Sequence, residues 1–125
     1  MQIFRGIRPE FTDERGSITR VLDTATPIRS VLLITSAAGT VRSNHYHKVD
    51  SHYCYVLSGK MEWHEKPVVG GATASAVLGP GDMVYTPPMT IHAVKFLEDS
   101  VFLAFATQPR NQPAYEADTI RVTLL

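Results

Sequence analysis

Short apolar or alternating runs, separated by turn-forming residues, recur along the whole chain. There is little of the 3.6-residue periodicity that marks an amphipathic helix. Short strands at regular spacing are typical of a β-sandwich or a β-barrel, so the pattern predicts an all-β fold. The chain has 125 residues, which suits one domain spanning residues 1–125.

Turn-forming residues set the bounds of the expected strands. Asp13 and Gly16 stand at the first and fourth positions of an expected type I turn, and Pro80 with Gly81 suits a type II turn. The Pro-Pro pair that starts at Pro87 must end the strand before it. We expect strands at residues 17–22, 28–36, 43–47, 52–58, 61–65, 72–78 and 83–86, a hairpin made of 91–97 and 101–107, and a last strand near 119–124.

Three of the five histidines fall within eight positions. His45 and His47 are two residues apart in an expected strand, so their imidazoles point to the same side. His52 opens the next strand, which we expect to lie beside the first and to share its face. His92 follows the Pro-Pro pair much later in the chain. Convergent neutral imidazoles are ligands that suit Zn, Fe, Ni, Cu and Mn.

The spacing of these histidines among glycines and prolines resembles the two motifs of the cupin superfamily. The first motif, residues 39–59, contains Gly39, His45, His47, His52 and Gly59. The second motif, residues 81–96, contains Gly81, Pro87 and His92. The resemblance implies a double-stranded β-helix, which is a jelly-roll barrel. It also implies one divalent transition metal ion (Fe, Mn, Zn, Ni or Cu) bound by His45, His47, His52 and His92.

The sequence departs from the cupin pattern at three positions. The family usually has Glu where this chain has His52, Gly where it has Met89, and Asn where it has Phe96. The first change would replace a shell of three histidines and a carboxylate by a neutral shell of four histidines. The other two affect the turn and the packing near His92.

The resemblance implies several possible functions. Small metallocupins include dioxygenases, so the main expectation is an oxidoreductase that uses the mononuclear metal ion on a small molecule. The segment from Phe11 to Gly16 and the stretch from Arg42 to His47 also resemble the sugar-nucleotide cupins, in which a histidine acts as a base. The alternatives are therefore an isomerase or epimerase of a sugar nucleotide or keto acid, and a non-catalytic module that binds or senses a small molecule.

His64 and Cys54 are weaker candidates for the site. His64 shares a strand face with Lys60 and Glu62, which is typical of a solvent-exposed face. Cys54 shares a face with His52 but stands two residues away, roughly 7 Å along a strand, which suits the wall of a pocket better than a ligand. Its other interpretation is a small buried apolar side chain.

Arg42, Glu62 and Tyr85 each have two interpretations. Arg42 is either a contact for an anionic substrate or a solvated residue at a strand edge. Glu62 and Tyr85 are either an acid or base of the reaction or ordinary surface and core residues. The sequence assigns no catalytic residue among them.

Charge and composition limit the partners. Twelve basic residues balance twelve acidic ones, which gives no reason to expect nucleic acid or a membrane as a partner. The single cysteine and the lack of an apolar leader segment predict a cytoplasmic protein. Tyr53, Tyr55 and Leu57 form an apolar stripe on the strand face away from the histidines, so we expect a homodimer that covers this stripe or uses the N-terminal segment.

Overall fold

The computed structural model describes all 125 residues, about half of them in short strands. The strands are β1 (Gln2–Phe4), β2 (Phe11–Asp13), β3 (Gly16–Ile18), β4 (Ser30–Ser36), β5 (Val41–His47), β6 (His52–Ser58), β7 (Met61–Pro67), β8 (Ala74–Leu78), β9 (Met83–Thr86), β10 (Thr90–Phe96), β11 (Ser100–Ala106) and β12 (Thr119–Arg121). The one helix is α1 (Gln112–Asp118). With seven residues, this helix is too short to span a membrane.

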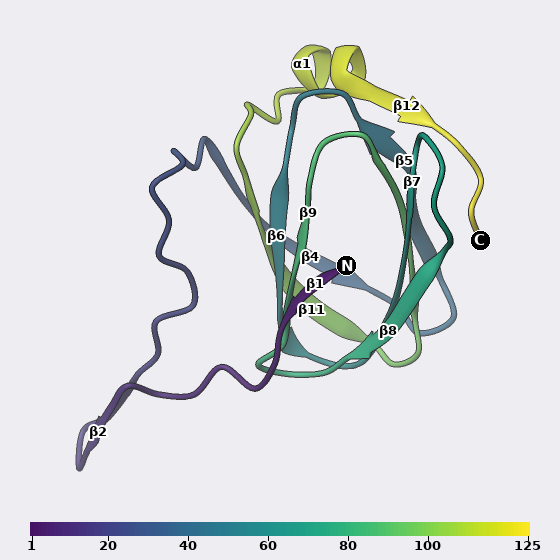
Figure 1. Cartoon of the computed structure of the whole chain (residues 1–125). Helices are drawn as coiled ribbons and strands as arrows, with labels where there is room; N and C mark the ends of the chain where they lie inside the picture. The colour runs from purple at the N-terminus through teal and green to yellow at the C-terminus, as the bar shows by residue number, and fades with distance from the viewer.

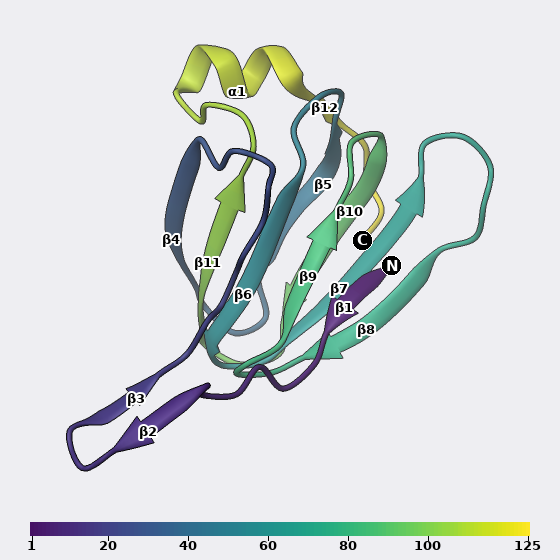
Figure 2. The ribbon, with the colours of Figure 1, turned by 60° about the vertical axis from the view of Figure 1, so that its left-hand side comes forward.

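Two five-stranded antiparallel sheets face each other and enclose the interior (Figure 1). One sheet has the order β1-β9-β6-β11-β4 and the other has the order β12-β5-β10-β7-β8. A separate hairpin of β2 and β3 projects from the barrel (Figure 2). The predicted all-β jelly-roll architecture is confirmed.

The interior has an apolar end and a histidine end. Along β6 the inward side chains change from His52 through Cys54 to Val56, and along β10 they change from His92 through Val94 to Phe96. The apolar end is a cluster that includes Val56, Met61, Leu78, Phe96 and Phe102, all buried. Helix α1 lies over the opposite end of the barrel (Figure 2).

The predicted hairpin of residues 91–97 and 101–107 is wrong. Strand β10 pairs with β5 and β7, whereas β11 pairs with β4 and β6 in the facing sheet. The connection between β10 and β11 therefore crosses from one sheet to the other. This crossing brings Phe96 and Phe102 together in the interior, with ring centroids 5.8 Å apart. The two runs are short, apolar and close in sequence, which is also how a hairpin looks in sequence.

Strands β5 and β6 are not neighbours either, although the sequence analysis placed them side by side. They lie in opposite sheets, so His52 faces His45 and His47 across the interior. The strand expected at 17–22 is shorter, since β3 ends at Ile18, and α1 was not predicted. The helix starts at an N-cap, where Asn111 Oδ1 accepts a hydrogen bond of 3.1 Å from the Ala114 amide.

Two glycines satisfy turns that need a left-handed backbone. Gly81 has a φ of +88°, which a type II turn requires at its third residue, and the Asp82 amide closes the turn on the Gly79 carbonyl at 3.0 Å. Gly59 joins β6 to β7 with a φ of +91°. A Cβ atom at Gly59 would collide with the Asp99 carbonyl and with Ser100, so only glycine fits there.

Candidate functional site

Four imidazoles from both sheets meet at the histidine end of the barrel. Strand β5 supplies His45 and His47, and β10 supplies His92, which pairs with His45 in the sheet register. Strand β6 supplies His52 from the facing sheet. Ring centroids are 4.7 Å apart for His45–His47 and for His45–His92, and 4.9 Å apart for His52–His92. The structure thus brings the four predicted ligands together, while their role as ligands stays a prediction.

A bulge in β5 precedes the first of these histidines. Ser43 and Asn44 have left-handed φ values of +71° and +55°, and the pairing with β10 shifts between His92 and Ala93. Such a bulge leaves an extra residue unpaired and re-aims the strand. The side chain of Asn44 uses this freedom to hold the end of the chain, since its Oδ1 accepts hydrogen bonds from the last two amides at 2.8 and 2.9 Å.

The histidines line a cavity of about 320 Å³. Cys54, Trp63, Arg110 and Tyr115 are also in its wall. The Trp63 ring lies parallel to the His92 ring at 5.8 Å, with 3° between their planes. The indole therefore fixes the plane of His92 from one side.

Hydrogen bonds determine which nitrogen of His92 and His52 carries hydrogen. His92 Nδ1 lies 3.0 Å from the Thr90 carbonyl, which can only accept, so Nδ1 carries the hydrogen. His92 Nε2 then has a lone pair, and His52 Nε2, 3.3 Å away, must donate to it. His52 Nδ1 in turn accepts from the Cys54 thiol at 3.6 Å. These hydrogen bonds form one continuous chain in which both imidazole rings are neutral.

Burial keeps the imidazoles neutral. It lowers the pKa of His47 and of His92 to about 4 and that of His45 to about 2, and it holds the pKa of His52 well below its usual value. Burial also raises the pKa of Cys54 to about 12, so the thiol keeps its hydrogen. At neutral pH the cluster therefore offers uncharged nitrogen donors.

His47 has the most distinctive environment of the four. Its Nδ1 lies 3.3 Å from Thr119 Oγ1, and the same hydroxyl donates to the Tyr115 carbonyl at 2.5 Å. Because the hydroxyl has one hydrogen, it accepts from His47, whose Nδ1 must carry hydrogen. His47 Nε2 then has a lone pair. It is buried and has no hydrogen-bond partner.

The nitrogen atoms fit the requirements of a metal ion. One nitrogen each from His45, His47 and His92 lie within 4.8 Å of one another. In His47 and His92 the opposite nitrogen is bound to an oxygen acceptor, which is the arrangement that orients a metal-ligating imidazole. Three histidines can therefore hold a metal ion. His52 is not part of this set.

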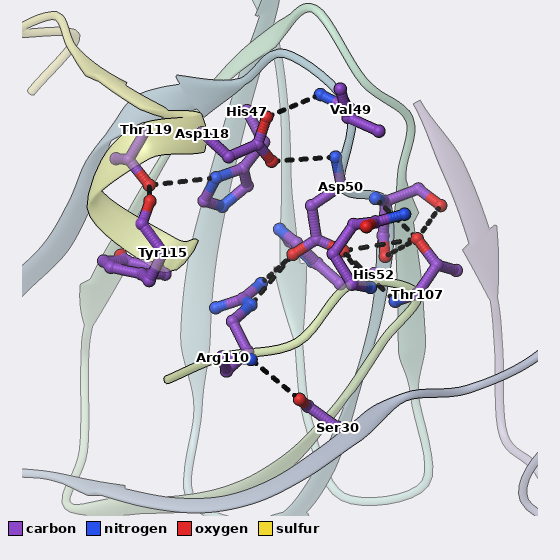
Figure 3. A network of polar contacts seen from close by, with 12 residues as sticks. Ser30, His47, Val49, Asp50, His52, Thr107, Arg110, Tyr115, Asp118 and Thr119 are labelled. Carbon is purple, nitrogen blue, oxygen red and sulfur yellow. Dashed lines mark hydrogen bonds and ion pairs between the residues drawn. The ribbon is translucent and has the colours of Figure 1, made fainter. Parts of the chain in front are cut away.

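A buried ion pair anchors the loop that follows β11 beside the cavity (Figure 3). Asp50 is 2% exposed, and one of its carboxylate oxygens accepts from Arg110 Nε and Nη2, both at 2.8 Å. The other oxygen accepts from the Thr107 amide and hydroxyl and from the Gln108 amide. Sequence reasoning missed Asp50, Arg110 and Thr119, because their partners lie about 60 to 70 residues away in the chain and no local pattern marks them.

Comparison with known proteins decides the family. A family model for the cupin domain matches residues 32–106, which is more than half of the chain. The chain belongs to the cupin family. No curated protein sequence matches this cupin.

Solved structures share the fold of this cupin at low sequence identity. They include dTDP-4-dehydrorhamnose 3,5-epimerase from Sulfolobus tokodaii, with a TM-score of 0.75, 21% identity, and coverage of 91% of this chain and 73% of that one. The 3,4-ketoisomerase QdtA from Thermoanaerobacterium thermosaccharolyticum, a double mutant in complex with TDP, has a TM-score of 0.75, 24% identity, and coverage of 96% and 86%. A 3,4-ketoisomerase from Helicobacter canadensis has a TM-score of 0.75, 18% identity, and coverage of 96% and 89%.

The oxidoreductase or dioxygenase function expected from the sequence is wrong. The structures that this cupin resembles include an epimerase and ketoisomerases, which matches the alternative expectation. The error has a chemical reason. Imidazole ligands suit redox metals and zinc alike, so a histidine cluster does not distinguish oxygen chemistry from isomerisation.

The remaining candidates from the sequence take different places. Arg42 lines the cavity, but its guanidinium donates to Ser36 Oγ at 2.6 Å and to the Thr35 carbonyl at 3.1 Å. Cys54 lines the cavity, as expected. Glu62, Tyr85 and His64 do not line it: Glu62 pairs with His64 at 2.8 Å, and the Tyr85 ring lies against the Tyr53 ring at 4.7 Å.

Proposed function

We propose that this cupin is an isomerase or epimerase that moves a proton on a carbon beside the carbonyl group of a sugar nucleotide or a keto acid. The observation that carries the proposal is the Nε2 lone pair of His47, which is buried and unpartnered in a ring that lines the cavity. The names of the similar structures support it, since one is a 3,5-epimerase of a 4-dehydro sugar nucleotide and others are sugar 3,4-ketoisomerases.

Both kinds of reaction need the same first step. A hydrogen on the carbon beside a carbonyl is removed as a proton, and the electron pair of the C–H bond moves onto the carbonyl oxygen. Return of the proton to the other face of that carbon inverts it. Where that carbon bears a hydroxyl, return of the proton to the former carbonyl carbon, with transfer of the hydroxyl proton to the former carbonyl oxygen, moves the carbonyl group. The protein must therefore supply a proton acceptor and a positive group near the oxygen.

This cupin has both groups in one cavity. His47 Nε2 is the acceptor, because its lone pair is free and its ring is neutral at pH 7. The Arg110 guanidinium lies in the same wall, held by Asp50, and supplies positive charge for the oxygen that becomes an enolate. A pKa of about 4 makes His47 a weak base, so the carbonyl must be strongly polarised for the proton to leave.

The proposal includes a divalent transition metal ion held by His45, His47 and His92. His52, the fourth ligand expected from the sequence, would join them only after its Nε2 loses the hydrogen that it donates to His92. Fe, Mn, Zn, Ni and Cu are the candidates. When bound, such an ion would polarise the carbonyl oxygen. It would also occupy the His47 lone pair, so His47 would be a ligand in the loaded protein and a base in the metal-free protein. Both roles depend on the same nitrogen.

The test is turnover of a defined substrate. The purified protein, metal-loaded and chelator-treated in parallel, is incubated with TDP-4-keto-6-deoxyglucose, which is the ligand of a similar ketoisomerase structure. A panel of keto acids is run beside it. We expect an epimer or a positional isomer, detected by NMR. Absence of any product from either preparation contradicts the proposal.

We also propose that two copies associate through the outer face of the β1-β9-β6-β11-β4 sheet. Val31 and Leu33 of β4 are 60% and 66% exposed there, and Tyr53 and Tyr55 of β6 continue the apolar surface. An exposed apolar face of this kind is typical of a protein interface. Leu33→Glu should convert a dimer of two 13.8 kDa chains into monomers, whereas Val69→Glu, in a distant loop, should not. A wild-type protein of single-chain mass in light scattering contradicts the dimer.

A further inference from the structure

Thr119 lies at the junction of α1 and β12, and several contacts fix it against His47. The two residues are paired in the β12–β5 register. The carboxylate of Asp118 accepts hydrogen bonds from the Val49 and Asp50 amides at 2.8 and 2.9 Å, and the Asp118 carbonyl accepts from the Lys48 amide at 3.1 Å. Thr119 itself is 6% exposed. Its hydroxyl therefore has a fixed place in the structure (Figure 3).

The Thr119 hydroxyl has one hydrogen, and that hydrogen is committed to another acceptor. The hydroxyl donates it to the Tyr115 carbonyl, one helical turn earlier, and a carbonyl oxygen can only accept. The hydroxyl can offer only a lone pair to His47 Nδ1 at 3.3 Å. A neutral imidazole with hydrogen on Nδ1 has none on Nε2, so the C-terminal segment determines which nitrogen of His47 is free.

We propose that Thr119 is a positioning residue that holds His47 in the tautomer whose Nε2 lone pair is available in the cavity. Without the hydroxyl, the Nδ1–H would be buried with no acceptor, which is unfavourable. The ring would then favour the opposite tautomer, with hydrogen on Nε2 and no lone pair there for a proton or a metal ion. The chemical consequence rests on the proposed function, whereas the tautomer itself does not.

The experiment reads the tautomer directly. Long-range ¹H–¹⁵N NMR spectra of the chelator-treated protein identify the hydrogen-bearing nitrogen of His47 in the wild type, Thr119→Val and Thr119→Ser. We expect Nδ1–H in the wild type and Thr119→Ser, and Nε2–H or a mixture in Thr119→Val. Thr86→Val is the matched control, because Thr86 is also buried and its hydroxyl donates to Glu65 instead.

Zinc affinity, measured by calorimetry on the same proteins, is the second readout. Loss of a residue that orients a metal ligand weakens binding by about 10–100-fold. We expect this loss of zinc affinity in Thr119→Val. Thr119→Ser should keep nearly the wild-type affinity, and Thr86→Val should lose none. Thr119→Val that keeps Nδ1–H and unchanged zinc affinity overturns the inference. If Thr119→Val does not fold, a wild-type His47 with hydrogen on Nε2 overturns it equally.

The two proposals can fail separately. A Thr119-dependent tautomer in a protein that neither binds zinc nor isomerises a sugar supports the positioning role and contradicts the proposed function. Isomerase activity together with a His47 tautomer that does not respond to Thr119 supports the proposed function and contradicts the positioning role.

Discussion

At the scale of single residues, Met89 has an unfavourable backbone conformation, and its amide holds the end of β5. Its φ is +59°, in the left-handed region where a Cβ atom costs roughly 1–2 kcal/mol. Its amide donates to the His47 carbonyl at 2.8 Å, so the turn that it forms holds the end of β5. The cupin pattern has glycine at this position, and the observed φ gives the physical reason.

Met89→Gly should therefore stabilise the protein. Relief of the left-handed strain exceeds the extra flexibility of glycine in the unfolded chain, and the Met89 side chain is 44% exposed, so little burial is lost. We expect the free energy of unfolding in urea to rise by up to about 1 kcal/mol. Leu97→Gly is the control, since Leu97 is similarly exposed but has no left-handed φ, and it should lower stability. Equal losses in both variants would show that the Met89 backbone carries no strain.

At the scale of elements, strand positions could be predicted from the sequence because strand periodicity is local. The bounds of β6 (His52–Ser58) and β9 (Met83–Thr86) agree with the expected ranges. Strand pairing could not be predicted, as β10 and β11 show, because the choice of partner depends on packing between sheets. Helix α1 has a capping residue but only seven residues, too few for a periodic signal.

The loop between β11 and α1 depends on Asp50. This buried carboxylate binds Arg110 and the backbone at Thr107 and Gln108. Asp50→Ala leaves a buried guanidinium without its partner, so the free energy of unfolding should fall by about 3–5 kcal/mol in urea denaturation. Asp23→Ala, at an exposed ion pair with Arg20, should change it by less than about 0.5 kcal/mol. Similar small effects in both variants would mean that the Asp50 contacts do not stabilise the fold.

At the scale of the whole molecule, the barrel separates an apolar end from a histidine end. From the sequence it could be predicted that His45 and His47 point to the same side of their strand, because side chains alternate along a strand. It could not be predicted that His52 arrives from the facing sheet, or that residues 107–119 close the site, because both depend on contacts made far along the chain. The fold explains why four imidazoles stay neutral: they share one buried cavity.

These imidazoles should make stability depend on pH. Histidines in the unfolded chain titrate near ~6.5, whereas burial lowers the pKa of His47 and His92 to about 4 in the folded protein. Below pH ~6.5 the unfolded chain binds protons that the folded chain excludes, so stability is complete above that pH and falls toward pH ~4. The slope should approach ~1.4 kcal/mol per pH unit for each histidine. Urea denaturation of chelator-treated protein measures it. His92→Asn should reduce the slope, and a pH-independent wild type would contradict burial of neutral rings.

The most direct test of the central claim is exchange of solvent deuterium into a substrate. In D2O, the chelator-treated wild type and His64→Gln, whose ring lies outside the cavity, should place deuterium on the carbon beside the carbonyl of TDP-4-keto-6-deoxyglucose. His47→Gln should slow this exchange by at least about 100-fold, because the accepting nitrogen is gone. Absence of deuterium with the wild type, or equal rates in His47→Gln, would contradict proton transfer at His47.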